Sequence, residues 1–165
     1  MGLAIALLTI SDTRSLADDA SGDQLQQCLE QAGHRLNERM LCADDRYRIR
    51  AELSRWIADP CVDVVITSGG TGLTGRDGTP EAVEPLLDKT IDGFGELFRV
   101  LSFESIGTST LQSRCLAGVA NGTFVFVLPG SLDAVTTAWE RLIHAQLDAE
   151  TRPCNLAQLR KRLKE

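Results

Sequence analysis

The segment DVVITSGGTGLTGRDGTPEA, residues 63–82, runs from an apolar stretch into a loop of glycines and threonines. Residues 62–67 are rich in β-branched side chains, which is typical of a parallel strand that is buried on both faces. A helix is predicted to follow the loop, with Thr79 as its N-cap and Pro80 in the first helical position. The segment therefore predicts a strand, a long glycine loop and a helix in succession.

Apolar runs of strand length alternate with helical patterns along the rest of the chain. The predicted strands cover residues 3–10, 36–42, 62–67 and 123–128. The predicted helices cover residues 22–33, 45–58, a stretch that begins at 79, 92–103 and 131–147. This order is typical of a doubly wound α/β domain with a mostly parallel sheet. We expect a single domain over residues 1–165, because a chain of this length with 43% apolar residues can bury one core of ordinary size.

Two apolar features are predicted to serve packing. Trp56 and Trp139 lie at helical spacing with aliphatic residues, so we expect them in the core or at a subunit interface. The apolar segment 93–103 is likewise predicted to pack rather than to line a pocket.

Composition argues against several classes of protein. Residues 3–10 are apolar, but no basic region precedes them and no small-residue cleavage site follows, so they predict a buried strand rather than a signal peptide. No apolar run approaches the roughly 18 to 20 residues that span a bilayer. The net charge of −6 argues against general binding to nucleic acid. We expect a cytoplasmic protein without a membrane or nucleic-acid partner.

The sulfur and imidazole groups do not form a metal-binding pattern. The five cysteines are widely spaced and never form a C-x-x-C pair, so we expect reduced thiols that mostly serve packing. His34 and His144 are the two histidines, and neither lies near a cysteine or carboxylate at ligand spacing. A dedicated zinc or iron site is therefore not expected.

Residues 70–75, GTGLTG, match the G-x-G-x-x-G pattern of dinucleotide-binding folds. In those folds the third glycine lies in the first turn of a helix that follows the first strand. In this chain Gly75 is followed by Arg76, Asp77 and Gly78, which do not favour a helix, and no acidic residue ends a strand about 20 positions later. The dinucleotide interpretation is therefore disfavoured. A Walker A loop is excluded because residues 63–82 contain no lysine.

The remaining interpretation is a phosphate loop of another kind. Small residues allow backbone N–H groups to face an anion, and hydroxyls are available at Ser68, Thr71 and Thr74. Asp77 would repel phosphates unless a cation lay between them, which indicates Mg²⁺ held jointly by the protein and the substrate phosphates. Alternatively, Asp77 accepts hydrogen bonds from the amides of its own loop, as aspartate often does in turns. Spacing favours neither interpretation over the other.

Ligands of doubly wound sheets bind beyond the carboxyl ends of the strands. Three loops are predicted to meet at that edge. They are SDTRS at 11–15, the glycine loop after 62–67, and PGS at 129–131.

Several segments in sequence order resemble the molybdenum cofactor biosynthesis family that includes MoaB, MogA and the G domains of plant and animal homologues. They are SGGTGLTGRDGTPEA at 68–82, GFGELFRVLSFESIGTSTLQSR at 93–114 and VLPGS at 127–131. The likeness is closest to the bacterial MoaB branch and extends from residue 7 to Asn155. The resemblance implies a three-layer α/β/α fold with a mostly parallel sheet. It also implies a homo-oligomer, for which the MoaB branch favours a hexamer over a trimer.

Active members of this family bind molybdopterin, a pterin dithiolene phosphate, and adenylylate it with Mg-ATP, releasing pyrophosphate. The resemblance implies the same partners for this chain, namely molybdopterin and a nucleotide, with Mg²⁺ as cofactor. Two alternatives remain: a non-catalytic protein that binds or carries molybdopterin or a nucleotide, and a scaffold subunit of a cofactor assembly complex. The presence of both functional acids of the family favours the enzyme.

The family motifs place the candidate catalytic and Mg²⁺-binding acids at Asp77 and Asp44. The resemblance implies a set of substrate-binding residues from five segments of the chain: Ser11, Asp12, Ser68, Gly69, Gly70, Thr71, Gly72, Glu96, Ser113, Pro129, Gly130 and Ser131. In this hypothesis the amides of 69–72 and the Thr71 hydroxyl bind phosphate oxygens. Ser11, Ser113 and the 129–131 loop face the pterin or its phosphate.

The chain departs from the family pattern at two places. Ala43 replaces the proline that usually precedes the second acid, and the turn carries both Asp44 and Asp45, so either acid can face the site. Gly78 replaces the valine of RDVTP, which loosens the end of the glycine loop. Both reactive carboxylates are retained.

Overall fold

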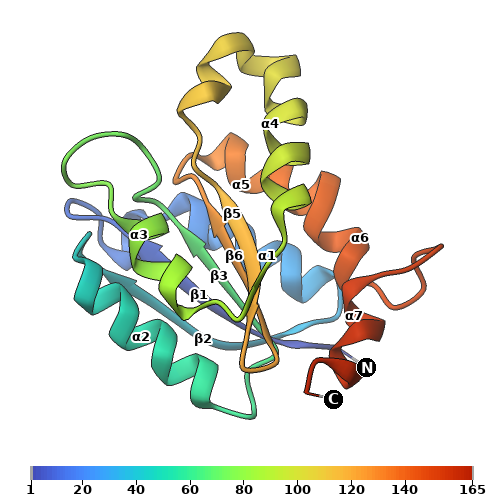
Figure 1. Ribbon diagram of the computed structural model, residues 1–165. Coiled ribbons are helices and arrows are strands. Elements are labelled where there is room, and N and C mark those ends of the chain that lie inside the picture. Colours follow the sequence, from blue (N-terminus) through green and yellow to red (C-terminus); the bar gives the residue numbers. More distant parts are fainter. Residues whose placement is uncertain (1, 165) are drawn as a thin grey trace.

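The computed structural model, which describes residues 2–164, is built on a six-stranded sheet with the order β2-β1-β3-β6-β5-β4 (Figure 1). The strands are β1 (Ala4–Ile10), β2 (Arg35–Cys42), β3 (Val64–Ser68), β4 (Lys89–Thr90), β5 (Leu116–Ala120) and β6 (Thr123–Leu128). β2, β1, β3 and β6 are parallel, whereas β5 and β4 are antiparallel to their neighbours. The mostly parallel sheet is therefore confirmed.

Helices cover both faces of this sheet, which confirms the three-layer architecture (Figure 1). They are α1 (Ala20–Gln31), α2 (Arg46–Ala58), α3 (Thr79–Val83), α4 (Asp92–Ile106), α5 (Leu132–Ala138), α6 (His144–Leu147) and α7 (Leu156–Leu159). A π-helical turn at Trp139–Ile143 joins α5 to α6. Short 3-10 turns lie at Leu16–Asp18, Glu84–Leu86, Gly107–Gln112 and Arg160–Arg162.

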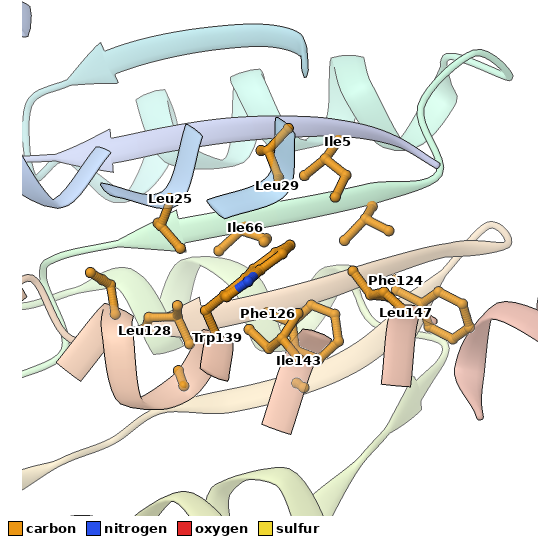
Figure 2. Close-up of a cluster of buried hydrophobic side chains, with 14 of the residues drawn as sticks. Ile5, Leu25, Leu29, Ile66, Phe124, Phe126, Leu128, Trp139, Ile143 and Leu147 are labelled. Carbon is orange, nitrogen blue, oxygen red and sulfur yellow. The ribbon is translucent and has the colours of Figure 1, made fainter. Parts of the chain in front are cut away.

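The core has two halves because the parallel strands are buried on both faces. In β1, Ile5 and Leu7 point towards α1, α4, α5 and α6, whereas Ala6 and Leu8 point towards α2 and α3. This division follows from the alternation of side chains along a strand. Figure 2 shows the half that contains Ile5, on the face covered by α1, where Trp139 lies among aliphatic and aromatic side chains from the sheet and from α1. The predicted burial of both tryptophans is confirmed, with Trp56 0% and Trp139 4% exposed.

Two local expectations are wrong. The sequence interpretation contains no strand between 104 and 122, yet β5 lies there and forms an antiparallel hairpin with β6. Asn121 and Gly122 make its turn with φ values of 48° and 81°, and Asn-Gly is the strongest short-range signal for such a turn. Thr79 is not the N-cap of α3. Gly78 holds that position, and the Thr79 hydroxyl donates to Gly69 O (2.9 Å).

The apolar segment 93–103 packs on one side only. Phe94 and Phe98 are buried in the core, but Leu97, Val100 and Phe103 are 55%, 62% and 57% exposed. In Figure 1 the end of α4 and the turn that follows it extend away from the sheet. Among residues 2–164, none of the helices combines the length and the apolar composition needed to cross a membrane.

Candidate active site

The three predicted loops meet at the carboxyl ends of β1, β3 and β6, around a cavity of about 580 Å³. We call it the glycine-loop cavity. Ten of the predicted substrate-binding or catalytic residues line it: Ser11, Gly69, Gly70, Thr71, Gly72, Asp77, Ser113, Pro129, Gly130 and Ser131. The second half of α4 forms another wall, through Phe98, Ser102, Ser105 and Ile106, and α5 contributes Asp133, Ala134 and Thr137.

The path of the glycine loop requires glycine at two positions. Gly69 and Gly70 have φ values of 106° and 65°, which side-chain-bearing residues rarely adopt. A Cβ atom on Gly69 would also lie 2.2 Å from Ile10 O. The N–H of Gly69 donates to Leu128 O (3.0 Å), so this amide is already satisfied within the sheet. Of the amides of 69–72 that were predicted to bind phosphate, that of Gly69 is therefore not free to do so.

The choice between Asp44 and Asp45 is decided by the start of α2. Asp45 is the N-cap of that helix and accepts hydrogen bonds from the N–H groups of Tyr47 (3.0 Å) and Arg48 (2.9 Å). Asp44 faces the glycine loop instead, where its Oδ1 accepts from Gly78 N–H (3.3 Å). A Cβ atom on Gly70 would lie only 2.6 Å from Asp44 Oδ2. Asp44 is thus the acid that borders the loop.

Asp77 caps its own loop. Its Oδ2 accepts hydrogen bonds from the hydroxyl (2.6 Å) and the backbone N–H (2.9 Å) of Thr74. The Thr74 hydroxyl is the main cause that holds the pKa of Asp77 below its ordinary value. The loop-capping interpretation is confirmed. The carboxylate also borders the cavity and packs against Gly72, where a Cβ atom would lie only 2.7 Å from its Oδ2. A magnesium role for Asp77 stays a prediction.

The acidic groups at this edge influence one another. Burial raises the pKa of Asp44, and the charges of Asp77 and Asp12 raise it further. Asp12 lies outside the cavity lining and accepts from Asp44 N–H (3.0 Å). Its carboxylate also binds the fork of Arg76 at 2.8 and 2.9 Å, which lowers the pKa of Asp12. One arginine therefore offsets part of the charge of a cluster of three carboxylates.

The acidic groups beside the glycine loop suit a magnesium ion that brings most of its own ligands. Among residues 2–164, no group of three or more His, Cys, Asp or Glu side chains is placed to hold a metal. Mg²⁺ in nucleotide sites commonly takes one or two protein carboxylates, with phosphates and water as its other ligands. Asp44 and Asp77 both lie against the glycine loop, where the absence of a Cβ atom on Gly70 and Gly72 lets each carboxylate approach the backbone closely. The residues therefore fit an ion that arrives with a phosphate substrate.

The opposite wall of the cavity offers polar groups to a second ligand. The Ser113 hydroxyl oxygen is buried and, within residues 2–164, has no hydrogen-bond partner beyond a weak interaction with the Cys115 thiol. Buried hydroxyls are normally satisfied, so this one is suited to a polar ligand. Ser131 accepts from Ala134 N–H (3.2 Å) and caps α5.

Sequence reasoning missed Arg14, although it lies in the SDTRS loop that was singled out. Arg14 lines the cavity and donates through Nη1 to Gly130 O (3.2 Å). Of the described residues that line the cavity, it is the one cation. Its position in a loop at the carboxyl end of β1 was the available signal.

Four predicted residues are absent from the cavity lining, namely Asp12, Asp44, Ser68 and Glu96. Ser68 is 2% exposed at the end of β3 and does not reach the cavity lining. Glu96 lies in a separate hollow beside Arg99 and Cys115. It is two residues from Phe98 on α4, which corresponds to about 200° around a helix, so it points away from the wall that Phe98 and Ser102 build.

Comparisons with known proteins agree with this geometry. Residues 6–149 match the family model described as "Probable molybdopterin binding domain". Molybdenum cofactor biosynthesis protein B of Escherichia coli K12 is 55% identical over 151 residues, covering 92% of this chain and 89% of that protein. The Staphylococcus aureus Mu50 protein of the same name is 42% identical over 146 residues, covering 87% and 86%.

Solved structures show the same likeness. A crystal structure of molybdenum cofactor biosynthesis protein B superimposes with a TM-score of 0.89 at 39% identity, covering 99% of this chain and 97% of that one. The tungsten cofactor synthesizing protein MoaB of Pyrococcus furiosus superimposes with a TM-score of 0.77 at 34% identity, covering 86% and 90%.

Proposed function

The chain belongs to the family of molybdopterin-binding domains that includes molybdenum cofactor biosynthesis protein B, and from that premise we propose that it adenylylates molybdopterin with Mg-ATP. Its role lies in molybdenum cofactor biosynthesis. One observation supports the enzymatic step above all. Two carboxylates, Asp44 and Asp77, lie against the same glycine loop, so close that a Cβ atom on Gly70 would lie 2.6 Å from Asp44 Oδ2 and one on Gly72 would lie 2.7 Å from Asp77 Oδ2.

The reaction joins two phosphates. A phosphate oxygen of molybdopterin attacks the α-phosphorus of ATP and forms a P–O–P bond, while the bond from the α-phosphorus to the β-phosphate oxygen breaks and pyrophosphate leaves. The attacking phosphate is already ionised at neutral pH, so no general base is needed. Catalysis then depends mainly on positioning the two anions and neutralising their charge.

Each part of the glycine-loop cavity has a role in this proposal, together with Asp44, which lies outside the cavity lining against Gly70 and Gly78. The backbone N–H groups of Gly70 and Thr71 and the Thr71 hydroxyl bind phosphate oxygens of the nucleotide. Asp44 and Asp77 would hold Mg²⁺, which supplies charge neutralisation at the triphosphate when bound. On the other wall, Ser113 binds the pterin or its phosphate, and Arg14 adds the positive charge that a second anion needs.

The direct test combines purified protein with molybdopterin and Mg-ATP and measures pyrophosphate and adenylylated product. Asp77→Asn and Asp44→Asn should each abolish turnover while the fold is kept. Asp45→Asn is the matched control, because asparagine also caps helices and residue 45 faces α2 rather than the loop. Normal turnover by Asp77→Asn would contradict the magnesium role. Equal losses in Asp44→Asn and Asp45→Asn would contradict the assignment of Asp44.

A protein that binds molybdopterin without adenylylating it is the second candidate. The observation that favours it is that Asp77 already accepts two hydrogen bonds from Thr74, which serves the loop rather than a metal. Such a protein would bind molybdopterin in the same cavity with an affinity that does not depend on Mg-ATP, and it would release no pyrophosphate in the assay above.

We also propose that the chain assembles as a homo-oligomer, with a hexamer favoured. The support is a set of exposed apolar side chains along α4 and the turn after it: Leu97, Val100, Phe103, Ile106 and Leu111. Apolar patches of this kind usually mark interaction sites. Phe103→Glu should yield smaller species in native mass spectrometry, whereas Leu16→Glu, which changes an equally exposed leucine elsewhere, should not. A wild-type monomer would contradict the proposal.

A further inference from the structure

Arg114 holds both ends of the glycine loop. Its Nε donates to Gly72 O (2.8 Å) and its Nη2 donates to Asp77 O (2.9 Å). Its Nη1 forms an ion pair with Glu81 on α3. The planar guanidinium group thus joins two backbone carbonyls that are five residues apart in sequence to a carboxylate on the following helix. Arg114 is absent from the described residues that line the glycine-loop cavity, so it acts on the loop from behind.

The backbone between these two carbonyls, residues 72–77, determines where the Asp77 carboxylate lies. Asp77 N–H donates to Thr74 O (3.1 Å), and Thr74 N–H donates back to Asp77 Oδ2 (2.9 Å). These two bonds close a small turn, but a glycine-rich segment loses much conformational entropy when it is ordered. Anchoring Gly72 O and Asp77 O supplies the long-range restraint that the turn itself lacks.

We propose that Arg114 is a positioning residue for the nucleotide site: its bridge between Gly72 O and Asp77 O sets the backbone of residues 72–77 and so aims the Asp77 carboxylate. This inference rests on the proposed adenylylation for its catalytic consequence but not for its structural content. A lysine cannot replace the arginine, because an ammonium group is a point charge without a planar fork that reaches several acceptors at once. Arg114 also acts electrostatically, since its charge is a lesser cause, after Thr74, of the lowered pKa of Asp77.

Arg50 provides a matched control for a purely structural role. Its Nη2 donates to Glu81 O (2.8 Å) and its Nε to Ala82 O (3.1 Å), so it also binds two backbone carbonyls with a partly buried guanidinium group. It joins α2 to α3, and these two hydrogen bonds do not involve the glycine loop. Arg50→Lys therefore removes a similar bridge without touching residues 72–77.

The first experiment needs no substrate. Amide hydrogen exchange is measured in the ligand-free wild type, Arg114→Lys and Arg50→Lys. We expect faster exchange at Thr74 and Asp77 in Arg114→Lys and unchanged exchange there in Arg50→Lys. Glu81→Gln, which keeps the arginine, should give a smaller increase, and it replaces Arg114→Lys if that variant fails to fold. Unchanged exchange at Thr74 and Asp77, or an equal change in Arg50→Lys, would overturn the proposal.

The second experiment measures kcat and the KM for Mg-ATP over a range of pH. Removing a residue that orients a metal ligand typically costs about 10–100-fold in affinity or activity. We expect kcat/KM for Mg-ATP to fall by that factor in Arg114→Lys at each pH measured. Wild-type kinetics in Arg114→Lys would overturn the positioning role. If the wild type itself releases no pyrophosphate, the proposed function fails, and the exchange comparison alone decides whether Arg114 sets the loop.

Discussion

Replacing Gly70 with alanine is expected to displace Asp44 and to destabilise the protein by about 2–5 kcal/mol. The backbone φ of 65° lies in the left-handed region, which costs roughly 1–2 kcal/mol for a residue with a Cβ atom. The added methyl group would also lie 2.3 Å from Thr79 Oγ1 and 2.6 Å from Asp44 Oδ2. Overpacking of this kind costs about 1–3 kcal/mol, which brings the sum to roughly 2–5 kcal/mol.

The neighbours of Gly70 differ in how far they can yield. Thr79 is fully buried, and its hydroxyl donates to Gly69 O (2.9 Å), so turning it away breaks a buried hydrogen bond. Asp44 is less enclosed and is held by Gly78 N–H at 3.3 Å. The strain should therefore push Asp44 away from the loop, which would remove one proposed magnesium ligand along with the stability.

The free energy of unfolding is measured in urea with tryptophan fluorescence as the signal, because Trp56 and Trp139 are both buried in the folded protein. Gly75→Ala is the matched control in the same loop, where an added Cβ atom meets nothing within 4 Å. The control should remain within about 0.5 kcal/mol of the wild type. Equal unfolding free energies for Gly70→Ala and Gly75→Ala would refute the reasoning.

Two further predictions concern buried ionisable groups. Asp19 is fully buried and accepts hydrogen bonds from Thr9 (2.6 Å), Gly22 N–H (3.0 Å) and Arg39 (3.0 Å). Asp19→Ala leaves Arg39 without this partner, so it should lower the free energy of unfolding in denaturant by about 3–5 kcal/mol. Burial raises the pKa of Asp19, but these hydrogen bonds outweigh burial and lower the pKa below 3.8. The contribution of Asp19 to the free energy of unfolding is therefore present above pH 3.8 and is lost as pH falls through the folded pKa. A wild-type free energy of unfolding that does not change with pH below 3.8 would contradict this. Burial lowers the pKa of His34 below 6.5, and its Nδ1 accepts from Leu3 N–H (3.1 Å). The unfolded state then binds more protons below pH 6.5, so the free energy of unfolding should fall as pH drops below that value, and His34→Gln should remove this slope in unfolding curves recorded on either side of it.

Local periodicity was sufficient for most of the fold. The apolar runs predicted four of the six strands, and the helical spacing predicted the helices that cover them. β5 was missed because its residues alternate weakly between small and aliphatic side chains, although the Asn121-Gly122 pair carried a hairpin signal. β4 has only two residues and depends on pairing with β5, so no local pattern identifies it.

The candidate site could be predicted as a set of loops but not as a geometry. Asp44 and Asp45 are adjacent and chemically identical, and the start of α2 decides which one faces the glycine loop. Glu96 carries a family motif, yet its place on α4 turns it away from the cavity. Motif matching identifies residue types at positions in the sequence, whereas the direction of a side chain depends on the element that carries it.

By itself, the sequence determined the order of most strands and helices, the glycine loop within residues 63–82, and the edge of the sheet where the loops meet. These properties follow from side-chain periodicity and from the rule that parallel strands end at one edge. Only the tertiary structure decided that Arg114 bridges Gly72 to Asp77 and that Arg76 binds Asp12. Those partners come from distant parts of the chain, and their distances are set by how the whole sheet and its helices pack.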